Sequence, residues 1–323
     1  MPGFLLIGIG GGLASAVLFA SAAAGGGAGR LLLYLLVPLP SLLSGLGWGS
    51  AAAGVAALAG AAGVSAALGL KSALMFFLTQ GLPVAVICYL ALLARPVDET
   101  AAPGTSALEW YPAGHLVTAA TLIAGGLATI SMLLLGPDLE ALRTLLRDLI
   151  ENVFLKELPG FKDKPLSGDE IAAVTEFALY ALPAGFAMTW LGGFLVNVWL
   201  AGRITRMSGR LMRPWPDLSA MTFPRWLALA LAAAFAMTFT TGYPALLGSG
   251  FAGAFFLAYV LMGLAIVHFI TRGKPSRPFV LWGVYLSLLI LNTWAALIIA
   301  LLALMEPFLP LRRTQPPGPS TPD

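Results

Sequence analysis

The chain has 323 residues, of which 59% are hydrophobic and only 10% are charged, and its formal net charge is +3. Soluble domains contain roughly 45–50% apolar and about 25% charged residues, so a water-soluble fold is excluded. The Lys and Arg residues lie at the ends of apolar segments, which is typical of a membrane protein and excludes a nucleic-acid surface. We therefore expect a protein whose first partner is the lipid bilayer.

Cysteine and histidine are scarce. Cys88 is the only cysteine, which excludes an intrachain disulfide and a thiolate metal cluster. His115 and His268 are the only histidines. The sequence accordingly predicts no metal site and no cofactor.

Long stretches without charge predict the membrane spans. A helix needs about 20 apolar residues to cross the hydrocarbon core, and a charge at its centre costs about 2.5–3.5 kcal/mol. The predicted spans are 4–24, two within 31–70 turning near 47–49, 72–94, 116–135, 177–202, two within 226–271 turning near 243–244 and 248–250, and 279–305. The predicted fold class is all-α: a polytopic transmembrane helix bundle of about nine spans plus one amphipathic interfacial helix.

The predicted domain organisation follows from these spans. Residues 1–136 form an N-terminal five-span bundle, and residues 137–170 form an amphipathic helix and connector. Residues 171–311 form a C-terminal four-span bundle, and the Pro-rich residues 312–323 form a disordered tail.

Basic clusters predict the orientation, with one conflict. Arginines crowd the loops after the sixth and eighth predicted spans, which lie on one side and should be cytoplasmic. Nine spans then place the N-terminus inside and the C-terminus outside. Arg312 and Arg313 contradict that ending, so either the charge rule is overridden here or the count is wrong by one.

The connector after residue 136 carries an amphipathic pattern. Apolar residues recur at spacings of three and four (Leu139, Leu142, Leu146, Leu149 and Val153), with charged residues between them. Asp138 is placed to cap the first turn, and Ser167 with Glu170 has the spacing of a capping box for the sixth span. We expect an interfacial linker helix; a moving lid or a partner-docking helix is the alternative.

Small residues recur every four positions in three predicted spans. The series are Gly8, Gly12, Ala16, Ala20 and Ala24; Gly45, Gly49, Ala53, Ala57, Ala61, Ser65 and Gly69; and Ala181, Gly185, Thr189, Gly193, Asn197 and Ala201. Positions four apart share a helix face, so each series makes a smooth groove for another helix. The grooves serve packing within the chain, or the first of them docks a partner membrane subunit.

Few polar side chains lie inside the predicted spans. Gln80, Asn197 and Asn292 are the candidate ligand-binding residues, because intramembrane polar groups often mark a solute pathway. The alternative is that they form hydrogen bonds between helices. Catalysis is not expected: Ser249 and His268 are about 28 Å apart along a helix at 1.5 Å per residue, and the sequence predicts that the protein is not an enzyme.

Four motifs carry a resemblance to a known family. They are LLIGIGGGLAS at 5–15, YLLVPLP at 34–40, GLGWG at 45–49 and EWYP at 109–112. Over nearly its whole length the chain resembles the YybS-like family of bacterial multi-pass membrane proteins of uncharacterised function. More distantly, the first spans resemble the S-components of energy-coupling-factor vitamin transporters, which implies that Ala16, Ala20 and Ala24 dock a coupling subunit.

Two functions are therefore expected. The leading one is a solute-binding or transport component of the bacterial inner membrane, with Gln80, Asn197 and Asn292 contacting a small molecule. The alternative is a non-transporting scaffold that organises a cell-envelope complex through its helix faces and the helix after residue 136.

Overall fold

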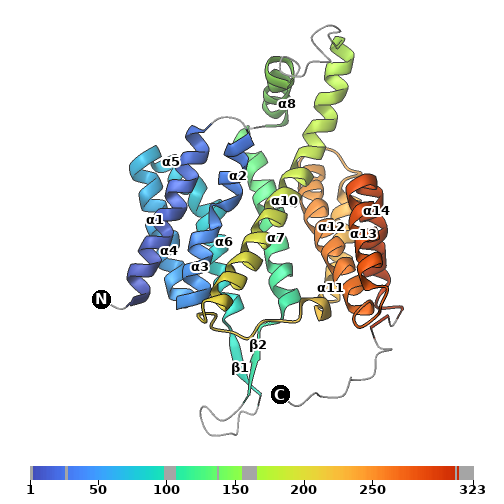
Figure 1. Ribbon diagram of the computed structural model, residues 1–323. Helices are drawn as coiled ribbons and strands as arrows, with labels where there is room; N and C mark the ends of the chain where they lie inside the picture. The colour runs from blue at the N-terminus through green and yellow to red at the C-terminus, as the bar shows by residue number, and fades with distance from the viewer. Residues whose placement is uncertain are drawn as a thin grey trace.

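The computed structural model describes residues 3–25, 28–97, 107–136, 138–154, 166–309 and 311–312, and these fold into an all-α polytopic bundle (Figure 1). In this part of the chain seven helical segments are long and apolar enough to cross a membrane. They are α1 (Gly3–Ala24), α2–α3 (Ala28–Leu36 and Pro38–Trp48), α4 (Ser50–Leu68), α5–η1–α6 (Leu70–Phe76, Phe77–Gly81 and Leu82–Ala91), α7 (Ala113–Leu135), α10 (Gly168–Met207) and α12 (Tyr243–Ile270).

Shorter elements complete the described fold. They are α8 (Leu139–Leu149) with η2 (Ile150–Phe154), η4 (Leu218–Ala220), α11 (Trp226–Met237), α13 (Arg277–Leu291) and α14 (Thr293–Met305). The chain also forms one antiparallel pair that the sequence did not predict, β1 (Ala94–Pro96) and β2 (Leu108–Trp110). Figure 1 shows this pair at one end of the bundle and α8 at the other.

The first predicted hairpin turns where expected. Gly49 has φ 100° between α3 and α4, a backbone conformation that favours glycine, and its N–H donates to the Gly45 carbonyl at 3.0 Å. The second hairpin turns at one place only. The chain reverses before Tyr243, at Gly242 with φ 76°, whereas residues 248–250, where a turn was also predicted, lie inside α12.

The glycines at 248 and 250 have a packing function instead. A Cβ added at Gly248 would lie 2.6 Å from the Met237 Cβ of α11, and one at Gly250 would lie 3.1 Å from the Ala128 Cβ of α7. Because small residues allow helices to approach closely in lipid, these glycines mark contacts rather than a turn. With 12 residues, α11 is about 18 Å long at 1.5 Å per residue, shorter than the hydrocarbon core.

The last predicted span, 279–305, is divided in two. The chain reverses at Asn292 (φ 42°, ψ −106°), and α13 packs beside α14. After α14, Arg312 pairs with Glu306 and donates to the carbonyls of Ser219 (3.1 Å) and Met221 (2.8 Å), in the loop that follows α10. Both ends of the α13–α14 hairpin therefore lie at the arginine-rich face, which corrects the predicted ending on the opposite side.

That correction removes the conflict over orientation. Arg312 lies on the same face as the arginine clusters, so the charge rule holds with one reversal more than predicted. Arg313 and the rest of the predicted tail, 313–323, lie outside the described residues.

Helix α8 is anchored to the bundle. Asp138 accepts from the Ala141 N–H at 2.8 Å, and Ser167 and Glu170 form a reciprocal capping box, so both predicted caps are confirmed. Leu142 and Leu146 pack against Leu179 of α10 and Leu246 of α12. The amphipathic face thus contacts protein rather than headgroups. Residues 155–165 of the predicted connector lie outside the described residues.

The largest apolar core is shared by helices from both predicted bundles. It includes Leu42 of α3, Val84 of α6 and Ala124 of α7, together with Leu191 of α10 and Ala254 of α12. The N-terminal and C-terminal helices therefore pack on each other around one interior, with α10 between them (Figure 1).

The α13–α14 hairpin predicts which side chains share a face of the membrane. Single cysteines replacing Lys274 and Phe308 should react with a membrane-impermeant thiol reagent from the same side, and a cysteine replacing Thr144 on α8 only from the opposite side. Cys88 is buried and should stay silent. If Phe308→Cys reacted from the same side as Thr144→Cys, the segment 279–305 would cross the membrane once, contrary to this prediction.

Candidate functional site

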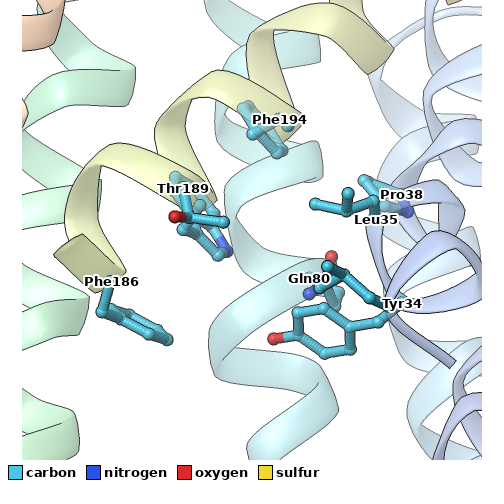
Figure 2. Close-up of a pocket in the computed structure, with 10 residues that line it drawn as sticks. Tyr34, Leu35, Pro38, Gln80, Phe186, Thr189 and Phe194 are labelled. Carbon is cyan, nitrogen blue, oxygen red and sulfur yellow. The ribbon is translucent and has the colours of Figure 1, made fainter. Parts of the chain in front are cut away.

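A cavity of ≈ 190 Å³ lies between α2–α3, η1 and α10. Its walls are Leu31, Tyr34, Leu35, Pro38, Gln80, Phe186, Thr189, Trp190, Gly193 and Phe194. Figure 2 shows residues of α10 on one side of the space and Tyr34, Leu35 and Pro38 on the other, with Gln80 between them. Leu31 at the edge is 57% exposed, so the cavity reaches the surface that faces lipid.

A proline in the fourth span shapes one wall. Pro83 has no N–H, so the carbonyl of Thr79, four residues earlier, loses its helical donor. The helix widens to the π-helical turn η1 there, and the Trp190 indole N–H donates to the Thr79 carbonyl at 3.0 Å. Trp190 also stacks on Phe194, with ring centroids 4.8 Å apart. The kink thus fixes two aromatic walls of the cavity.

A second proline break shapes the opposite wall. Pro38 and Pro40 lack N–H groups, and the second span divides at Val37 into α2 and α3. Beside this break the Asn197 Nδ2 donates to the Leu35 carbonyl at 2.6 Å and to the Gly193 carbonyl at 2.7 Å. Asn197 therefore ties α10 to the kinked second span, one turn beyond the cavity.

Gln80 is the predicted ligand-binding residue that lines the cavity. It is buried in η1, and its side chain interacts with the Tyr34 hydroxyl. Asn197 does not line the space; its Nδ2 is engaged by backbone carbonyls, while its Oδ1 has no hydrogen-bond partner among the described residues. Gln80, Tyr34 and Thr189 are the cavity residues that can offer a side-chain hydrogen bond to a bound molecule, since the Trp190 N–H is already used.

The other predicted residues lie elsewhere. Asn292 is exposed at the reversal between α13 and α14, away from the cavity. Ser249 donates to the Tyr180 carbonyl, and His268 shares a 3.0 Å hydrogen bond with Tyr285, so the structure does not bring these two together. Nowhere in the described residues do three His, Cys, Asp or Glu side chains gather in a way that could hold a metal.

Sequence reasoning missed Tyr34, Thr189 and Trp190 as cavity residues. The available signal was the set of prolines inside predicted spans, Pro38, Pro40 and Pro83, because each opens a helix and frees a backbone carbonyl. Which side chains reach those carbonyls depends on which helices are neighbours.

The small-residue series of α1 lies against α4. A Cβ at Gly8 would lie 2.8 Å from the Ala52 carbonyl oxygen, and one at Gly12 would lie 2.8 Å from the Gly60 nitrogen. Ala16 is buried beside Gly63, Ala20 is half-buried and Ala24 is exposed. Gly8, Gly12 and Ala16 therefore contact α4, and Ala20 and Ala24 lie at the more exposed C-terminal end of α1.

The bundle and its kinked interior define a polytopic α-helical membrane protein with an apolar cavity between its spans. Residues 14–306 match the model of a family described as "Predicted membrane protein (DUF2232)", and the chain belongs to that family. No curated protein and no solved structure matches the chain.

The contact between α1 and α4 predicts a matched pair of variants. Gly12→Leu should lower the stability by about 1–3 kcal/mol, because the new side chain meets the backbone of α4. Gly10→Leu, on the same helix, should change it little, since a Cβ there meets no atom within 4 Å. Thermal unfolding in detergent measures both. Equal effects would mean that α1 does not pack on α4 in this register.

The hydrogen bonds of Asn197 predict that replacing it lowers the stability of the protein and does not affect binding alone. Asn197→Leu leaves the Leu35 carbonyl unpaired at a buried break, which should cost about 1–3 kcal/mol. Thr189→Val, which removes a hydroxyl without a hydrogen bond in the described structure, should have a smaller effect. An Asn197→Leu variant that unfolds at the wild-type temperature would contradict the role assigned to the amide.

Proposed function

We propose that this protein binds a small, largely apolar molecule inside the membrane, as a solute-binding or transport component of the bacterial inner membrane. The observation that carries the proposal is the cavity itself. Its walls are mostly aliphatic and aromatic, with Gln80, Tyr34 and Thr189 as the polar groups, which is the usual composition of a small-molecule site. An ionic solute would lose its hydration there without a charged partner.

The position of the cavity favours entry from the bilayer. Leu31 and Thr189 lie at its edge on α2 and α10, and both are exposed on the surface that faces lipid. A molecule dissolved in the membrane can reach this edge without crossing the headgroup layer. The bound molecule is therefore proposed to be apolar with one or two hydrogen-bonding groups.

A partner membrane subunit belongs to the same proposal. The resemblance to S-components implies that this subunit docks on α1. Because Gly8, Gly12 and Ala16 contact α4, the proposed docking surface is Ala20, Ala24 and the face of α1 that points away from α4. We propose a role in binding without catalysis, which is supported by the separate hydrogen-bond partners of Ser249 and His268.

The test compares two variants of α10. Thr189→Phe should fill the cavity, whereas Val196→Phe adds the same ring at a position outside the cavity that is 61% exposed. Small molecules extracted from the purified proteins are identified by mass spectrometry. The proposal expects a molecule that accompanies the wild type and Val196→Phe but is lost from Thr189→Phe. The absence of any such molecule from all three proteins would contradict it.

A scaffold function is the second candidate, and one observation favours it. The N-terminal part of α10 extends beyond the other helices together with α8 (Figure 1), and Phe177 there is 75% exposed. Cross-linking through a photoreactive residue at position 177 tests this candidate. A single cross-linked protein partner, together with a cavity that retains no molecule, would favour the scaffold.

A further inference from the structure

The face with β1–β2 and the loop after α10 concentrates basic side chains. Its described cations are Arg95, Arg203, Arg206, Arg210, Arg213, Arg225, Arg272, Lys274, Arg277 and Arg312. The described acidic side chains at this face are Glu109, Asp217 and Glu306, and each already pairs with an arginine: Arg95, Arg272 and Arg312, respectively. The remaining cations have no carboxylate partner in the described part of the chain.

Asp217 is engaged by both Ser219 and Arg272. Burial acting alone would raise the pKa of Asp217, but hydrogen bonds from Ser219 and Arg272 outweigh it and hold the pKa below its usual value. Asp217 accepts from Arg272 at 2.9 Å and from the Ser219 hydroxyl at 2.8 Å. It is not available to neutralise the arginines of α10.

Two of the unpaired arginines share one aromatic platform. The guanidinium carbons of Arg203 and Arg206 lie 5.8 Å and 5.7 Å from the ring centroid of Trp215. Neither guanidinium donates a hydrogen bond to any described residue. A cation–π contact holds a guanidinium beside an indole without using its N–H groups, which can then donate to the oxygens of a phosphate.

The platform itself is fixed in place. Trp215 packs over Gly202, where an added Cβ would lie 3.1 Å from the indole Cζ3. Pro214 and Pro216 restrict the backbone on both sides of Trp215. The Met212 N–H donates to the Leu46 carbonyl at 3.4 Å, which holds the loop against the end of α3. The two arginines are therefore presented by a rigid surface rather than by a free loop.

An exposed apolar stripe leads to these arginines along α10. Val196, Trp199 and Met207 are all exposed, and their spacing places them on the helix face from which Arg203 and Arg206 also project. Hydrocarbon chains can lie along this stripe while a headgroup reaches the end of the helix. Trp residues favour the same headgroup layer.

We propose that Arg203 and Arg206, held in cation–π contact with Trp215, bind the phosphate of an anionic phospholipid whose acyl chains lie along the α10 stripe. The site is distinct from the cavity, which shares none of these residues. A free phosphate would contact the arginines but not the apolar stripe. An acidic protein would not require a stripe that continues into the membrane-spanning part of α10.

The experiment measures bound lipid by native mass spectrometry of the purified full-length protein. Phosphatidylglycerol is the probe, and phosphatidylcholine and inorganic phosphate are the comparison ligands. Wild type should retain phosphatidylglycerol in preference to the other two. The double variant Arg203→Gln/Arg206→Gln should weaken its binding by about 100-fold, since each lost charge-assisted hydrogen bond to the phosphate costs about a factor of ten.

The control removes the same charge from the same face. Arg225→Gln/Lys274→Gln, which alters two exposed cations away from Trp215, should leave most of the binding intact. Trp215→Leu should weaken binding while the net charge stays unchanged, and circular dichroism establishes that each variant is folded. Equal losses in the two double variants, or binding of inorganic phosphate as tight as that of phosphatidylglycerol, would overturn the proposal.

Discussion

The structure depends on one constraint: inside a bilayer, every backbone donor and acceptor must be satisfied by the protein itself. Prolines make this difficult, because each removes a donor and opens the helix around it. The Trp190 indole donates to the carbonyl freed by Pro83, and the Asn197 amide donates to the Leu35 carbonyl beside the break at Pro38 and Pro40. Near Pro183 in α10, Ser249 of α12 donates to the Tyr180 carbonyl. These polar side chains of the spans thus donate hydrogen bonds to backbone carbonyls of neighbouring helices.

The cavity is a consequence of the same constraint. A helix interrupted by proline cannot pack evenly along its full length, and a cavity remains between α2–α3, η1 and α10. Trp190, which donates to the carbonyl freed in η1, forms one wall of that space. Elsewhere small residues line the contacts between helices, and there the helices approach closely, as at Gly12 and Gly60. The interior therefore contains a cavity beside the proline breaks and close helix–helix contacts where small residues meet.

The sequence predicted those parts of the fold that depend on local chemistry. The charge-free stretches located the long spans, and Asp138 and Ser167 located two helix starts, because lipid solvation and capping act over a few residues. It did not predict the reversal at Asn292, since neither a proline nor a charge interrupts 279–305 and its glycine, Gly283, lies well before the reversal. Gln80 was found by its polarity alone, whereas Tyr34 and Thr189 became recognisable only when α2 and α10 were seen to be neighbours.

The α13–α14 hairpin is held in place by polar contacts at its two ends as well as by packing. No residue of α13 is buried, so packing holds this helix weakly, and α14 gains its position from contact between Gly263 and Ile299 and from the Glu306–Arg312 pair. The Arg312 and Glu306 side chains are only 11% and 14% exposed, and burying both charges costs desolvation that their attraction offsets only with additional hydrogen bonds. The carbonyls of Ser219 and Met221 accept those bonds. Because the same loop carries Asp217, which binds Arg272 at the end of α12, one polar network fixes both the entry and the exit of the hairpin at the arginine-rich face.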